Sequence, residues 1–146
     1  MMTRVLFDTS VLVAAIIKPH PAHERAFPWL RKAKRREILM IISSHTLAEL
    51  YAVLTTMSVS PRITPDIAWR LVREDILNIA EISALSAADY KSIIRKLKDH
   101  GFSGGIVYDA LICQAAVKAG VEMLLTLNSG DFRRLQMTGD INILEP

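Results

Sequence analysis

Four acidic residues in four separate segments of the chain could do chemistry together: Asp8, Glu49, Asp109 and Asp131. Carboxylates gathered in one place repel one another, and they cannot all stay ionised unless a cation neutralises them. Mg²⁺ and Mn²⁺ are hard divalent ions that prefer oxygen ligands of this kind. The four residues therefore predict a divalent metal site suited to phosphodiester hydrolysis, provided that the fold brings them together.

Asp8 stands at a junction between two expected elements. It follows residues 5–7, a short apolar run that indicates a buried strand, and it precedes residues 11–17, which can form a helix. Open α/β sheets bind their ligands beyond the carboxyl ends of such strands. An Asp at this position can also cap the following helix, so both roles remain open.

Asp109 is expected to point inward. Its helical neighbours at i+3, i+4 and i+7 are Ile112, Cys113 and Ala116, an apolar stripe that should face the core. A buried, unpaired carboxylate costs several kcal/mol, whereas a helix N-terminus stabilises a carboxylate by only about 0.3 to 1 kcal/mol. A metal ion or another cationic partner is therefore the better explanation for Asp109.

Glu49 has an alternative structural role. The segment from Thr46 to Glu49 fits a capping box, in which the glutamate bonds to the start of its own helix. If the helix instead begins at Ser43 or Ser44, Glu49 lies beyond the first turn and that role disappears.

Asp131 follows residues 128–130, Asn-Ser-Gly, which are typical of a turn. A turn at this point and a role in ligand binding do not exclude each other.

Short apolar runs alternate with longer helical patterns along the chain. The expected strands are residues 5–7, 38–42, 80–82, 123–126 and 141–143. The expected helices are residues 11–17, 22–34 with an interruption at Pro28, 47–54, 64–76, 86–98 and 107–120. This alternation predicts a parallel sheet covered by helices on both faces, with Asp8 and residues 126–131 at the same edge.

Composition favours one folded domain spanning residues 1–146. The chain is 51% hydrophobic and 23% charged, enough for a sizeable core without the signature of disorder. We find neither an apolar run of the ~18 residues that a membrane helix needs nor a signal peptide, and we expect a cytoplasmic protein. With Cys113 as the only cysteine and four scattered histidines, a zinc site fits poorly.

The net charge is +3, and one dense basic run stands out. It comprises Arg31, Lys32, Lys34, Arg35 and Arg36. Such a run can track the phosphate backbone of RNA, or it can be the solvated end of a helix, where basic residues suit the helix dipole.

The motifs together resemble those of PIN-domain ribonucleases and, within that family, the toxins of VapBC-type toxin–antitoxin pairs. The residues that carry the resemblance are Asp8-Thr9-Ser10, Glu49, Tyr108-Asp109-Ala110-Leu111-Ile112, and Thr126-x-Asn128-x-x-Asp131-Phe132. They are spread over nearly the whole chain.

The resemblance implies a three-layer α/β/α sandwich with a mainly parallel sheet, and endonucleolytic cleavage of RNA. It implies that Mg²⁺ or Mn²⁺ is held by Asp8, Glu49, Asp109 and Asp131. Hydrogen bonds from Thr9, Ser10, Thr126 and Asn128 would support that site. It also implies a homodimer and an antitoxin that blocks the site.

Two other enzyme classes are excluded by the residues around Asp8. Haloacid-dehalogenase-like phosphatases need a second Asp two residues later, where this chain has Ser10, and response-regulator receivers need an early acidic pair. A PIN-like module that binds RNA or protein without cutting remains an alternative, although the presence of all four acids argues against it.

Overall fold

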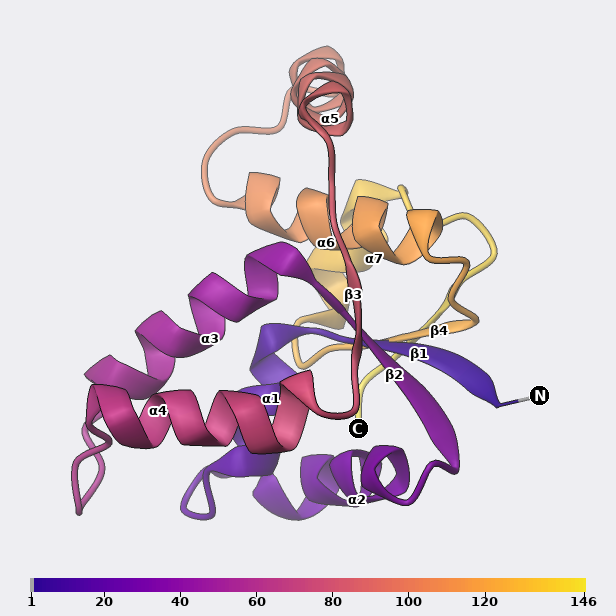
Figure 1. The fold of residues 1–146 in the computed structure, drawn as a ribbon. Helices are drawn as coiled ribbons and strands as arrows, with labels where there is room; N and C mark the ends of the chain where they lie inside the picture. Colours follow the sequence, from indigo (N-terminus) through magenta and orange to yellow (C-terminus); the bar gives the residue numbers. More distant parts are fainter. Residues whose placement is uncertain (1) are drawn as a thin grey trace.

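The computed structural model describes residues 2–146 and contains a five-stranded, all-parallel sheet in the order β3-β2-β1-β4-β5 (Figure 1). The strands are β1 (Thr3–Phe7), β2 (Ile38–Ser43), β3 (Glu81–Ser83), β4 (Met123–Leu125) and β5 (Asn142–Leu144). Their bounds differ by one or two residues from those expected, as is usual at strand ends.

Within the described residues, seven α-helices connect or cover the strands: α1 (Thr9–Ile16), α2 (His23–Lys34), α3 (Ser44–Thr56), α4 (Pro65–Val72), α5 (Ala87–Asp99), α6 (Ile106–Lys118) and α7 (Ser129–Leu135). A π-helical turn, Arg73–Leu77, continues α4. The start of α4 is as expected, with the Thr64 side chain capping the helix and Pro65 in its first position. Among the described residues, no helix is both long and apolar enough to cross a bilayer.

The expected interruption at Pro28 was wrong, because α2 runs through it as one helix. A proline removes one N–H donor from the helix ladder and crowds the preceding turn. The helix nevertheless buries Ala26, Leu30 and Ala33 on one side, and this packing holds it together on both sides of the proline.

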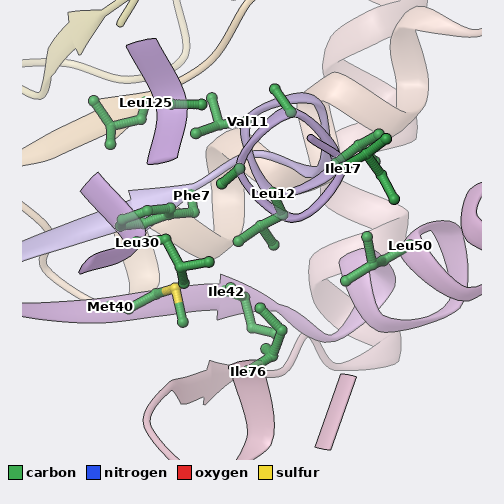
Figure 2. Packing of buried hydrophobic residues seen from close by; sticks show 14 of the residues in the cluster. Phe7, Val11, Leu12, Ile17, Leu30, Met40, Ile42, Leu50, Ile76 and Leu125 are labelled. Atoms are coloured by element: carbon green, nitrogen blue, oxygen red, sulfur yellow. The ribbon is translucent and has the colours of Figure 1, made fainter. Parts of the chain in front are cut away.

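Alternate side chains of the sheet enter two separate cores. Val5 and Phe7 of β1 lie in one core with residues of α1 to α4, and Figure 2 shows Phe7 among Leu12, Leu30 and Met40. Leu6, on the opposite face, lies in the other core with residues of α5, α6 and α7. The predicted three-layer α/β/α sandwich with a parallel sheet is therefore confirmed.

The strand order places a topological switch point between β1 and β4. From β1 the chain builds outward through β2 to β3, then crosses back to place β4 on the other side of β1. Connections that leave two neighbouring strands in opposite directions open a crevice beyond their carboxyl ends, where α/β sheets bind ligands. Asp8 and Thr126 directly follow these two strands.

Candidate active site

Asp8 sits in the crevice at the switch point, where it is only 4% exposed. Phe7 pairs with Leu125 in the sheet, so the next residues, Asp8 and Thr126, lie side by side. The Thr126 hydroxyl donates a hydrogen bond of 2.8 Å to Oδ2 of Asp8. The Ser10 hydroxyl donates to the same oxygen at 2.8 Å, and the Thr9 N–H donates to Oδ1 at 2.8 Å.

The two hydroxyls that bond to Asp8 are themselves fixed by the backbone after β4. The N–H of Leu127 donates to the Ser10 hydroxyl at 3.0 Å, and the N–H of Asn128 donates to that of Thr126 at 2.9 Å. With these acceptor positions filled, the hydroxyl protons are directed at Asp8. The orientation of the carboxylate is therefore set by residues from both ends of the sequence.

Of the two roles that the sequence left open for Asp8, the structure shows the helix cap, and the position of Asp8 is compatible with ligand binding. Asp8 is the N-cap of α1, and it faces the cleft described below. Burial raises the pKa of its carboxyl group, while the hydrogen bonds from Thr126, Ser10 and Thr9 oppose that rise and the charge of Glu49 adds to it. The hydrogen-bond donors therefore favour the ionised form of Asp8, whereas its burial disfavours that form.

Glu49 has no capping role. Ser43 is the N-cap of α3 and its hydroxyl accepts from the His45 N–H, so the capping box expected from Thr46 does not form. Glu49 lies beyond the first turn, partly exposed, and faces the same cleft as Asp8. Its Oε2 is 3.8 Å from Nε2 of His45.

Asp109 lies in the first turn of α6, at the head of the apolar stripe that the sequence predicted. Ile112, Cys113 and Ala116 are all buried below it. Burial, together with the charges of Asp8, Asp131 and Glu49, raises the pKa of Asp109 to about 6. The four acids therefore share one electrostatic environment, in which the pKa values of both Asp8 and Asp109 are raised.

Asp131 is placed differently from the other three. It lies in the first turn of α7, a helix that the sequence analysis missed because its first residues are typical of a turn. Its side chain is exposed and does not line the cleft, although its charge acts on Asp109. Arg134, one turn further along α7, lies 3.8 Å from Asp131.

The cleft has a volume of about 440 Å³ and contains three of the four acids, Asp8, Glu49 and Asp109. Ser10 and Asn128 also line it. Its carboxylate oxygens suit a hard divalent ion, and the repulsion that raises the pKa of Asp109 is what such an ion would relieve. Within residues 2–146, no three His, Cys, Asp or Glu side chains form a group that could hold a metal ion as they stand.

The basic run lies away from the cleft. Arg31, Lys32 and Lys34 are in the last turn of α2, directly before β2, and Thr3 at the start of β1 pairs with Ile38 at the start of β2. The run is therefore at the amino edge of the sheet, about 16 Å of strand away from Asp8. All five residues are exposed, and Lys34 forms an ion pair with Asp75. This position favours the interpretation as a solvated helix end.

Other residues lie around the acids: Tyr108 belongs to the motif quoted around Asp109, whereas His45 and His20 were not among the predicted site residues. The rings of His45 and Tyr108 stack in parallel, with centroids 5.1 Å apart, and each ring belongs to a helix that carries one of the acids. His20 lines the cleft from the loop after α1. His45 carried a usable signal, because it lies one helical turn before Glu49.

The chain belongs to a known class, the PIN-domain family, whose sequence profile matches residues 5–136. It is 36% identical over 117 residues to Ribonuclease VapC40 of Mycobacterium tuberculosis, covering 80% of this chain and 81% of that protein. It is 34% identical over 116 residues to Ribonuclease VapC27 of the same organism, covering 80% and 79%. These relatives confirm the family resemblance found in the sequence.

The fold is also shared with a solved VapBC structure. VapBC2 of Rickettsia felis, bound to a DNA fragment from its promoter, superposes with a TM-score of 0.65 over 99% of both chains. At 21% sequence identity, this likeness concerns the fold.

Proposed function

We propose that the protein is a Mg²⁺- or Mn²⁺-dependent endoribonuclease and the toxin of a toxin–antitoxin pair. The observation that carries the proposal is the cleft that gathers Asp8, Glu49 and Asp109 at the switch point, where burial and the neighbouring carboxylates raise the pKa of Asp109 to about 6. Membership of the PIN-domain family and similarity to two proteins named ribonucleases support RNA as the substrate.

Asp8, Glu49 and Asp109 would hold the ion, with Asp131 at the rim. A bound divalent ion activates water, stabilises the charge that develops on the phosphate and cancels its repulsion from the carboxylates. Asp8 is pre-oriented by its three hydrogen bonds, so little reorganisation is needed when a ligand arrives. Glu49 is far more exposed than Asp8 and would accept a proton from an attacking water.

The partner proposals rest on the VapBC likeness and on surface chemistry. Three large apolar side chains of α3 and α4 are exposed: Tyr51, Ile67 and Trp69. Exposed apolar surface of this kind is typical of faces that bind other proteins. We therefore include in the proposal an antitoxin that blocks the cleft, a homodimer, and action on RNA in the cytoplasm.

The experiment that tests this function is cleavage of a mixed RNA pool, including tRNA, by the purified protein. We expect cutting with Mg²⁺ or Mn²⁺, none with EDTA, and none by Asp8→Asn. Asp99→Asn, which removes an exposed acid at the end of α5, is the matched control and should cut like the parent.

Two results would count against the proposal. If Asp8→Asn cuts as well as the parent, the activity does not come from this cleft. If the parent cuts none of the RNAs with either metal, the alternative of a PIN-like module that binds RNA or protein without catalysis is favoured.

A further inference from the structure

The carboxylate cluster needs cations near it if it is to receive RNA. Each phosphate of the strand is repelled by Asp8, Glu49 and Asp109, and affinity for nucleic acid comes largely from Lys and Arg on the backbone. The basic run of Arg31 to Arg36 lies at the opposite edge of the sheet and cannot serve the nucleotides next to the cluster. The cations must therefore come from another part of the surface.

A second hollow, of about 540 Å³, lies between the end of α5 and the end of α7. Lys96, His100 and Arg134 give it basic character, and Phe102 contributes an aromatic face. Among the described residues that line it, none is acidic. We call this site the basic hollow. Cationic and aromatic side chains in one concavity are typical of surfaces that hold single-stranded nucleic acid.

Arg134 joins the basic hollow to the carboxylate cluster. Its guanidinium lies over the ring of Phe102, 5.5 Å from the centroid, while its Nη2 is 3.8 Å from Oδ1 of Asp131. Its positive charge also lowers the pKa of Asp109. A single side chain therefore contacts the wall of the hollow and acts on the acids, so the two sites adjoin.

We propose that the basic hollow binds a backbone phosphate of the RNA strand, on a nucleotide next to the bond that is cut at the carboxylate cluster. Lys96 and Arg134 contact the phosphate, with the planar guanidinium offering paired donors, and Phe102 packs against the sugar or base. The proposal rests on the proposed function for its substrate, and it adds the direction in which the strand leaves the site.

The test is the salt dependence of RNA binding, measured by fluorescence anisotropy with a labelled single-stranded RNA. All proteins in this test carry Asp8→Asn, so that the RNA is not cut during the measurement. Each phosphate contact that is lost reduces the slope of log affinity against log salt concentration by about 0.7 for single strands. We expect a reduction of about 0.7 for Lys96→Gln with Arg134→Gln, because the two side chains together neutralise one phosphate, and a smaller reduction for Lys96→Gln alone. The matched control, Arg35→Gln with Arg36→Gln, removes the same charge at the opposite edge and should leave the slope unchanged.

An unchanged slope in the Lys96 and Arg134 variants, or an equal reduction in the Arg35 and Arg36 control, would overturn the proposal. The four substituted Lys and Arg residues are all exposed, and a thermal melt checks that each variant is folded. RNA cleavage by the protein with Asp8 intact separates the two proposals. Cutting together with an unchanged slope rejects the hollow alone, and a reduced slope without cutting rejects catalysis alone.

Discussion

At the scale of single residues, the site depends on carboxylates that are held where their charge is disfavoured. Asp8 is compensated by three hydrogen-bond donors, but no side-chain hydrogen bond or ion pair holds Asp109 in the described structure. The same feature that makes Asp109 suitable for a cation makes it a source of instability when the cation is absent. Removing the Asp109 carboxylate should therefore lower activity and raise the stability of the metal-free protein.

Asp109→Asn is expected to abolish RNA cleavage and to stabilise the metal-free protein at pH 7.5. The pKa of about 6 lies about two units above the ordinary value of 3.8, which corresponds to about 3 kcal/mol. Asp109 is only half-buried, so we expect about 1 to 2 kcal/mol, or a rise in Tm of about 3 to 6 °C. Thermal melts in EDTA measure this, with the exposed Asp140→Asn as control. A clear loss of stability in Asp109→Asn would make the residue structural.

The residues of the site differ in how far the sequence could predict them. Asp8 and Asp109 stood out because each lay beside an apolar pattern of clear period. Glu49 could not be resolved, because Ser43 and Thr46 are both good helix caps and only the three-dimensional start of α3 decides between them. Arg134 and Lys96 were missed, since α5 and α7 both pack against α6 and the hollow that the two side chains share leaves no pattern in the sequence.

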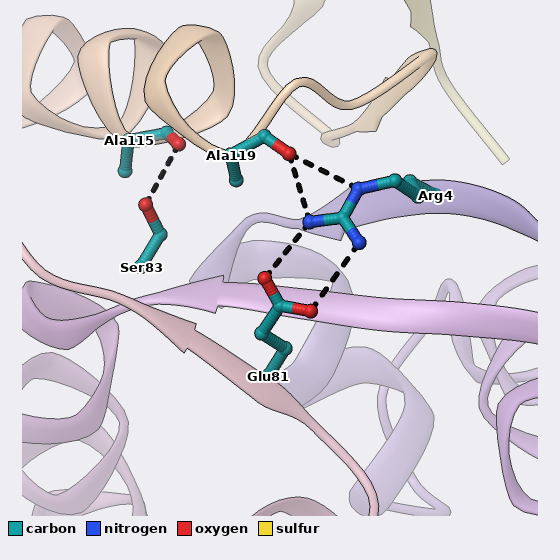
Figure 3. A network of polar contacts seen from close by, with 5 residues as sticks. All are labelled: Arg4, Glu81, Ser83, Ala115 and Ala119. Carbon is teal, nitrogen blue, oxygen red and sulfur yellow. Dashed lines mark hydrogen bonds and ion pairs between the residues drawn. The ribbon is translucent and has the colours of Figure 1, made fainter.

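At the scale of elements, α6 carries Asp109 at one end and is anchored to the sheet at the other. Figure 3 shows Arg4 of β1 donating two hydrogen bonds to the carbonyl of Ala119, at 3.0 and 2.8 Å, while it also pairs with Glu81. Ala119 is the C-cap of α6, where carbonyls lack partners within the helix. The Ser83 hydroxyl donates to the carbonyl of Ala115 one turn earlier, at 2.9 Å.

Arg4→Met should lower the free energy of unfolding by about 1 kcal/mol, because it removes both donors from the Ala119 carbonyl. Glu81→Gln should change it by less than about 0.5 kcal/mol, since an exposed ion pair contributes little. Urea unfolding of the two variants measures the difference. Equal losses would mean that the ion pair, and not the contact with α6, is what stabilises the structure.

Elements were easier to predict than their placement. The alternation of strands and helices was enough for the three layers and for the shared edge of Asp8 and Thr126. The sequence also held the position of the basic run. The run comes just before an expected parallel strand, which places it at the amino edge of the sheet, opposite Asp8. The shortness of α7, Ser129–Leu135, explains why it was missed, because seven residues give almost no periodic signal.

At the scale of the whole molecule, the acids should couple stability to both pH and metal. A carboxyl group whose pKa is raised on folding binds protons more tightly in the folded state, so its contribution to stability is lost as pH rises through the folded value. In the metal-free protein, the loss from Asp109 should fall between pH 4 and about pH 6. A divalent ion, which competes with that proton, should restore stability most strongly above this range.

Melts at pH 5 and pH 7.5, with EDTA and with Mg²⁺, test this coupling. The gain in Tm from Mg²⁺ should be larger at pH 7.5, and Asp109→Asn should reduce that gain and its dependence on pH. A gain that is the same at both pH values, or that survives in Asp109→Asn unchanged, would place the ion elsewhere on the protein.

The hydrogen bond between Thr126 and Asp8 joins residues that are 118 positions apart in the chain. During translation, a nascent chain that has emerged as far as α6 already carries Asp8, Glu49 and Asp109, yet it lacks the strand β4 that fills the sheet beside β1. Asp8 then has neither the Thr126 donor nor the backbone that orients Ser10. The orientation of Asp8 is therefore completed only when β4 and the residues that follow it have been made, so a C-terminal truncation before β4 leaves the three acids present but the support of Asp8 missing.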